Sequence, residues 1–100
     1  MATEDTVTDT LLQVIADITA ERYKQLAKGY TPELDAYLHG AAELECVAAY
    51  LVNPDANADA PAAWAARIKA KWGGNAYRLT IIAAALLVAA AEVRRAQSIA

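Results

Sequence analysis

The sequence predicts an all-α fold, a small four-helix bundle that we expect to be oligomeric. Helix caps and breakers divide the chain into four segments with helical apolar spacing, and no segment alternates like a strand. The 100 residues are 57% hydrophobic with no Phe, so small side chains let helices approach closely. In residues 79–91 only Thr80 is polar, and a helix that is apolar all round must be enclosed by its own domain, by other copies or by lipid.

The first two helices are defined by their ends. We expect the first from about Val7 to Lys28, with Thr6 or Thr8 as its N-cap and Gly29 as a left-handed exit. The second should open with Thr31 as N-cap and Pro32 in the first turn and run to Val52. Residues 53–60 then form a polar loop.

Two further helices complete the bundle. Pro61 should start a short third helix that ends at Trp72, and Gly73-Gly74-Asn75 should stop it and cap a fourth helix over residues 76–98. We expect residues 1–100 to form a single helical domain in which residues 1–6 are disordered.

Composition excludes several classes of protein. Thirteen apolar residues span only ~20 Å of helix, short of the roughly 30 Å core of a membrane. The acidic start is unlike a secretory signal, and a lone Cys46 fits a reducing cytoplasm. We therefore expect a cytoplasmic protein. Duplex nucleic acid is a poor partner for a chain of net charge −3.

The charge is divided between the two halves of the chain. Residues 1–59 hold eleven acids and three bases, net −8, and residues 60–100 hold one acid and six bases, net +5, which sum to −3. Either the basic helices pack against the acidic ones of the same or a neighbouring copy, or Arg67, Lys69, Lys71 and Arg78 form an anion site around the amino end of the last helix.

An arginine lies on the apolar face of the first helix. At 100° per residue Arg22 falls in the middle of the stripe, with Gln25 alongside and Glu21 at its edge; the stripe is made by Leu11, Ile15, Ile18 and Leu26. A buried arginine should meet a carboxylate or a bound anion. Alternatively, its head group reaches water near the helix end.

Two other patterns could carry chemistry. Asp35, His39 and Glu43 follow one another at spacings of four, so they could bind a divalent metal, hold a general base, or form a solvated row. Trp64 and Trp72 share a stripe with Ile68, beside Arg67 and Lys71. They could clamp a ring by stacking, or pack in a core or interface.

The chain resembles a group of small phage proteins of unassigned function. The likeness covers roughly residues 21–96 and lies in Glu21-Arg22-Tyr23-Lys24-Gln25, Gly29-Tyr30-Thr31-Pro32-Glu33-Leu34-Asp35 and His39-Gly40-Ala41-Ala42-Glu43-Leu44. These residues are similar to an E-R-x-x-Q motif and an aromatic-T-P-E-x-D turn of that group. The resemblance implies an all-α protein of the host cytoplasm. Some members are distantly similar to all-α NTP pyrophosphohydrolases, which hold magnesium between acids of two helices.

These features lead to a ranked set of functions. We expect a non-enzymatic homo-oligomer that binds a nucleotide-like or phosphorylated ligand, or a host protein, in counter-defence. Its ligand residues would be Arg22, Gln25, Trp64, Arg67, Lys71, Trp72 and Arg78. Under the alternative of a degenerate pyrophosphohydrolase, Mg²⁺ would be the cofactor and Glu21, Asp35, His39 and Glu43 would hold it. The other alternative is a purely structural oligomer.

Overall fold

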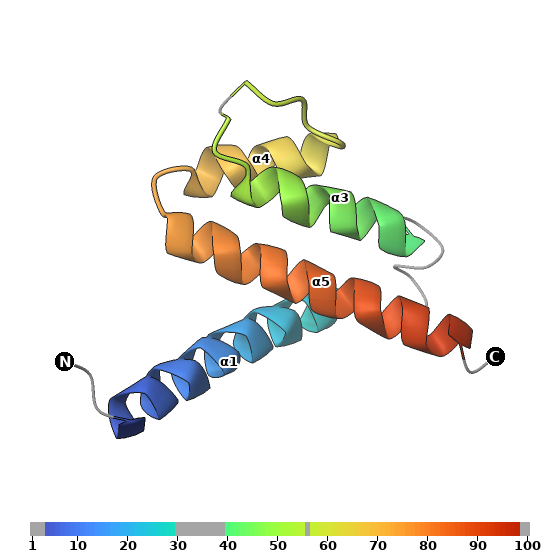
Figure 1. Ribbon diagram of the computed structural model, residues 1–100. Coiled ribbons are helices and arrows are strands. Elements are labelled where there is room, and N and C mark those ends of the chain that lie inside the picture. Colours follow the sequence, from blue (N-terminus) through green and yellow to red (C-terminus); the bar gives the residue numbers. More distant parts are fainter. Residues whose placement is uncertain (1–3, 30–39, 56, 99–100) are drawn as a thin grey trace.

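The computed structural model describes residues 4–29, 40–55 and 57–98. These residues form four helices and no strand, which confirms the all-α prediction (Figure 1). The helices are α1 (Glu4–Ala27), α3 (Gly40–Val52), α4 (Ala63–Trp72) and α5 (Ala76–Ser98).

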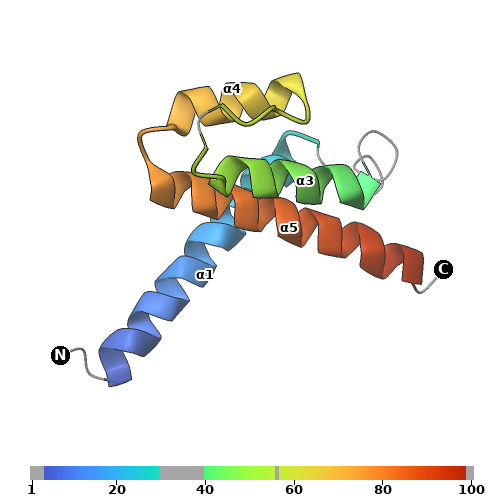
Figure 2. The same cartoon turned by 45° about the horizontal axis from the view of Figure 1, so that its top comes forward.

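Helix α5 is the centre of the molecule. Helix α3 runs along one side of it, α4 packs against both α3 and α5, and α1 crosses α5 on another side (Figures 1 and 2). Within the described residues, α1 contacts no helix other than α5. The fold therefore consists of a three-helix body with α1 attached to one face of its central helix.

The apolar core lies between α3, α4 and α5. Trp64, Ile68 and Trp72 of α4 are partly buried against it, which supports a packing role for part of each side chain. Among the described residues no side chain of α1 belongs to this cluster. Its buried members are Ala41, Leu44, Val47, Ala48, Leu51, Ala65, Leu79, Ile82, Ala83, Leu86, Ala89, Ala90 and Val93.

Two predicted helix ends are confirmed. Gly29 has φ +93°, the left-handed conformation that favours glycine after a helix. The Oδ1 atom of Asn75 accepts the backbone N–H of Arg78 at 3.0 Å, so Asn75 caps the first turn of α5.

The predicted starts of the first and third helices are wrong. Helix α1 already begins at Glu4, so residues 4–6 are helical rather than disordered, and positions 6 and 8 lie inside the helix. Helix α4 begins at Ala63, two residues after Pro61, and its N-cap is Ala62, which makes no side-chain cap.

The second helix is not continuous from Pro32. Gly40 has φ +74°, and a right-handed helix cannot pass through a residue with positive φ. Helix α3 therefore starts at Gly40. The predicted Thr31 cap and Pro32 lie outside the described residues.

The apolar segment 79–91 has a solvent-exposed strip. Leu87 is 49% exposed and Val88 39% exposed, so one copy of the chain does not enclose this segment completely, and enclosure by other copies stays a prediction. Helix α5 also reaches the length of a membrane span, contrary to our expectation from the thirteen apolar residues. Helix α5 has 23 residues and passes the length and composition test for a span, but half of its apolar window is buried inside the fold, as in the core helix of a soluble protein.

Candidate functional site

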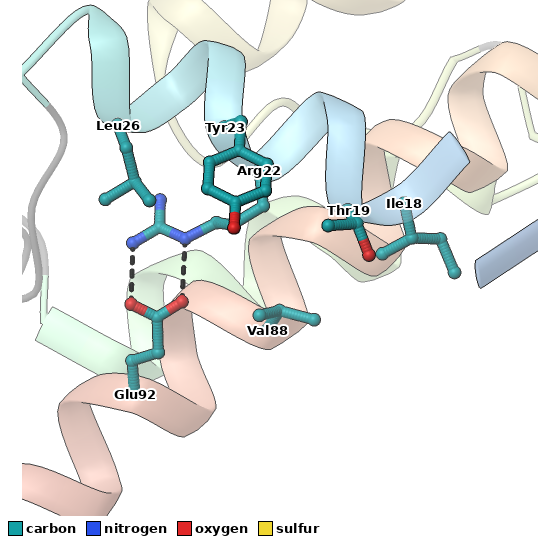
Figure 3. Close-up of a pocket in the computed structure, with 7 residues that line it drawn as sticks. All are labelled: Ile18, Thr19, Arg22, Tyr23, Leu26, Val88 and Glu92. Carbon is teal, nitrogen blue, oxygen red and sulfur yellow. Dashed lines mark hydrogen bonds and ion pairs between the residues drawn. The ribbon is translucent and has the colours of Figure 1, made fainter. Parts of the chain in front are cut away.

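The junction between α1 and α5 is held by an ion pair. Arg22 donates from Nε to Glu92 Oε1 at 2.8 Å and from Nη2 to Glu92 Oε2 at 3.0 Å (Figure 3). A third donor, Nη1, reaches Gln25 Oε1 at 3.2 Å. The Arg22 side chain is only 6% exposed, so the prediction that it meets a carboxylate is confirmed, and the alternative of a head group in water is wrong.

A second pair of contacts fastens the other flank of α1. Arg78 Nη2 donates to Glu21 Oε2 at 2.6 Å, and the Tyr77 hydroxyl donates to Asp17 Oδ2 at 2.5 Å. Three carboxylates of the junction thus each bind a side chain of the opposite helix. These bonds attach α1 to α5, whereas the main apolar cluster contains no described side chain of α1.

The hydrogen bond between Tyr77 and Asp17 changes the acidity of both groups. Because the phenol donates to the carboxylate, the pKa of Asp17 is lowered from 3.8, with further help from Gln13 and from the charge of Arg78. The same bond raises the pKa of Tyr77 above 10.0, since the neutral phenol is the form that donates.

Two hollows flank the junction. The larger has a volume of about 240 Å³ and lies beside the Arg22–Glu92 pair (Figure 3). Its other walls are Ile18, Thr19, Tyr23, Leu26 and Val88. The smaller, about 180 Å³, lies beside the Glu21–Arg78 pair and is also lined by Asp17, Ala20, Lys24, Tyr77 and Ile81.

Four of the predicted ligand residues share the end of α4 and the start of α5, which we call the α4–α5 corner: Arg67, Lys71, Trp72 and Arg78. The Lys71 ammonium lies 5.2 Å from the centroid of the Trp72 ring, and the Arg78 guanidinium lies 5.1 Å from it. Arg67 is exposed one helical turn before Lys71. The corner therefore combines a partly buried aromatic ring with positive charge.

The other predicted ligand residues do not join this corner. Arg22 and Gln25 lie at the α1–α5 junction, whereas Trp64 packs against the core cluster between α3, α4 and α5. The seven predicted ligand residues therefore do not form one site: four lie at the α4–α5 corner, two at the α1–α5 junction and one against the core cluster.

The predicted metal row is only partly described. Asp35 and His39 lie outside the described residues, and Glu43 is half-buried on α3. Glu21 belongs to α1, which does not contact α3 in the described ranges, and it is bound to Arg78. Within those ranges no three His, Cys, Asp or Glu side chains gather in a way that could hold a metal ion.

Lys69 has a structural role that the sequence did not predict. Its Nζ donates to the backbone carbonyls of Tyr50, Asn53 and Asp55 at 3.1–3.4 Å, and it lies 4.4 Å from the Tyr50 ring centroid. This cation therefore binds carbonyls at the end of α3 and the following loop, and we do not assign it to the anion site.

The packing interpretation of the charge division is supported. Arg78 and Arg94, from the basic half, bind Glu21 and Glu45, from the acidic half, each at 2.6 Å. Because Arg94 donates to Glu45, the pKa of this carboxyl is lowered from 4.5. Opposite charges thus meet across helix contacts within one chain.

No known protein family, no curated protein and no solved structure matches this chain. The fold and the junction define a small helical protein with an ion-paired α1.

Proposed function

We propose that this chain is a non-enzymatic binding protein that sequesters a nucleotide-like or other phosphorylated ligand at the α4–α5 corner. The observation that carries the proposal is the placement of two cations, Lys71 and Arg78, about 5 Å from the Trp72 ring. An aromatic face stacks on a base or another ring, and neighbouring cations attract phosphate.

Electrostatics supports an anionic ligand at this place. Arg67 and Lys71 are exposed on α4, and the only acid of residues 60–100 is Glu92, which is bound to Arg22 at the other end of the junction. Arg78 shares its charge with Glu21 through one Nη atom. The net charge of the α4–α5 corner is therefore positive, although the net charge of the whole chain is negative.

The resemblance to phage proteins suggests the setting of such binding. A phage protein that captures a nucleotide-like ligand without turning it over would remove that ligand from a host response. Alternatively, the ligand that this binding protein captures is a host protein.

The test is binding of a panel of nucleoside phosphates and cyclic dinucleotides, measured by isothermal calorimetry and by native mass spectrometry of gently purified protein. We expect Trp72→Leu to weaken binding about tenfold, since stacking of one base contributes about 1–3 kcal/mol. Lys71→Gln should weaken it and reduce its salt dependence.

Arg95→Gln provides a matched control, because Arg95 is exposed in the last turn of α5, far from the corner. It should bind as the parent chain does. Bare protein after gentle purification, together with no heat and no thermal shift for any nucleotide, would contradict ligand capture.

A purely structural role is the second candidate, and one observation favours it. Arg22, Arg78 and Arg94 are each bound to a carboxylate, so they act as packing groups. In that case alanine at Arg22 disturbs folding or assembly, and no ligand is found.

A further inference from the structure

The first half of α1 extends away from the other helices. Figures 1 and 2 show its amino-terminal turns projecting from the crossing with α5, and every side chain from Val7 to Gln13 is exposed. The apolar side chains of this projecting arm are therefore not covered within one copy of the chain.

This arm carries large apolar side chains on one side. Val7, Leu11, Leu12 and Ile15 are 49–60% exposed, and at 100° per residue Leu11, Leu12 and Ile15 fall on the side that also holds Thr19 and Tyr23. Arg22 lies on the same side of the helix, further along, where it is buried at the junction with α5. The apolar side therefore continues beyond the junction toward the amino terminus of α1, where it is open to another molecule.

The apolar side of the arm continues into the larger hollow. Ile18, Thr19 and Tyr23 belong to both, and Val88 of α5 forms the opposite wall (Figure 3). We call the whole surface the α1 stripe: Val7, Leu11, Leu12, Ile15, Ile18, Thr19, Tyr23 and Val88.

The area of the α1 stripe is close to that of a stable dimer interface. From the exposed fractions of Val7, Leu11, Leu12, Ile15, Tyr23 and Val88, covering these side chains would bury roughly 600 Å² per copy, whereas a standard interface buries about 800 Å² per partner. Backbone and polar side chains at the rim would add to this area. A second helix of the same length is long enough to cover it.

The charges of α1 favour an antiparallel second copy. Residues 4–17 contain four acids and no base, whereas in residues 18–28 Glu21 and Arg22 are already bound to α5 and the bases Lys24 and Lys28 remain exposed. Two parallel copies would place acid beside acid, and two antiparallel copies place the acidic half of each beside the basic half of the other. The helix dipoles are also antiparallel in this arrangement.

We propose that the α1 stripe is an isologous interface in which α1 of a second copy packs antiparallel to α1 of the first. With the two-fold axis near Ile15, Leu11 of each copy lies opposite Thr19 of the other, and Val7 lies at the level of Tyr23 but about 80° round the helix from Ile15. The arm of one copy thus enters the larger hollow of its partner, and the same contacts repeat across the axis. This inference is independent of ligand binding at the α4–α5 corner.

The first test is the solution mass of the full chain, measured by light scattering during gel filtration and by sedimentation velocity. The parent chain should form a dimer or an even multiple of it. Ile15→Glu should lower the mass by breaking this interface. Leu87→Glu is the matched control, because Leu87 is equally exposed at 49% but does not belong to the α1 stripe, and it should leave the mass unchanged.

Circular dichroism of both variants checks that the body still folds, as expected for substitutions at exposed positions. A monomeric parent chain overturns the proposal, and so does an Ile15→Glu variant that keeps the parent mass. A monomer that sediments with vesicles of phosphatidylcholine and phosphatidylglycerol assigns the α1 stripe to a membrane instead, and this outcome also overturns it.

The second test measures orientation. In a Cys46→Ser background, Ile15→Cys should oxidise to a disulfide-linked dimer because position 15 meets itself at the axis. Val7→Cys should not, because it lies at the level of position 23 of the other copy. Efficient self-cross-linking of Val7→Cys would indicate parallel helices and contradict the antiparallel interface.

Discussion

Arg22 and Glu92, seventy positions apart in the chain, form a bidentate ion pair that joins α1 to the central helix α5. The arginine is almost fully buried, and the side chain of the glutamate remains 32% exposed. Since the main apolar cluster contains no described residue of α1, this pair is a principal contact between α1 and the three-helix body.

Removing one partner should destabilise the protein more than removing both. Arg22→Ala is expected to lower the free energy of unfolding by about 3 kcal/mol, at the low end of the range for a broken buried pair, because Glu92 can regain some water. The double variant Arg22→Met with Glu92→Met should recover most of this loss. Urea unfolding followed by circular dichroism measures both values. An Arg22→Ala variant as stable as the parent chain would refute the role given to the pair.

The Tyr77–Asp17 bond predicts acid sensitivity of the α1 attachment. The pKa of Asp17 in the folded protein should lie below 3.8 when measured by carboxyl NMR titration, and Tyr77→Phe should raise it toward that value. Because the folded pKa is lowered, the contribution of this carboxylate is complete above pH 3.8 and is lost as the pH falls through the folded pKa. A pKa of Asp17 that does not respond to Tyr77→Phe would show that the bond is not formed in solution.

At alkaline pH the stability that this bond contributes decreases as the pH rises. The pKa of Tyr77 is raised above 10.0 in the folded state, so its stabilising contribution is present below pH 10 and is lost as the pH rises through the folded pKa. Ultraviolet titration of tyrosinate should therefore show one tyrosine fewer ionising near pH 10 in the parent chain than in Asp17→Asn.

Lys69→Met should loosen the loop after α3. The substitution keeps an apolar stem but removes the cation that holds three carbonyls, and we expect a loss of about 1–2 kcal/mol. Hydrogen exchange of the backbone around residues 53–60 should accelerate, while α5 stays protected. Arg95→Met is the surface control and should stay within about 0.5 kcal/mol of the parent chain. Unchanged exchange in this loop would contradict the assigned role.

Ala85→Leu should separate α1 from the body. Ala85 is fully buried yet does not belong to the main cluster, and it shares the α5 face of Arg78 and Glu92, which bind α1. A larger side chain there should cost about 1–3 kcal/mol and shift NMR signals of α1, with little change in the fluorescence of Trp64 and Trp72. Ala84→Leu, on a less buried neighbour, should have a much smaller effect. Equal effects of the two variants would show that α1 does not pack over Ala85.

The sequence predicted the helices where the local signals were complete. Gly29 and Asn75 act through their own backbone or through residues three positions away, so their roles follow from short-range chemistry. Gly40 was missed because apolar spacing continues across it, and only its positive φ shows the break. The need of Arg22 for a carboxylate followed from its position on an apolar face.

The identity of that carboxylate did not follow, because tertiary packing alone brings Glu92 to Arg22. Lys69 was missed for the same reason, since its partners are backbone carbonyls of another segment and leave no mark in the side-chain pattern. The exposure of the apolar side of α1 did not follow from the sequence, because periodicity shows that a helix has an apolar side without showing what covers it.

No described side chain of α1 belongs to the central cluster. Substitutions in α1 and substitutions in the other three helices are therefore limited by different contacts. Mutations in α3, α4 and α5 must preserve a closely fitted interior, whereas the outward side of α1 can change size and chemistry without disturbing that interior. Provided that Glu21 and Arg22 keep their partners, changes on α1 therefore act on its contacts with other molecules and not on the core, and this helix is the segment through which related chains could acquire different binding preferences.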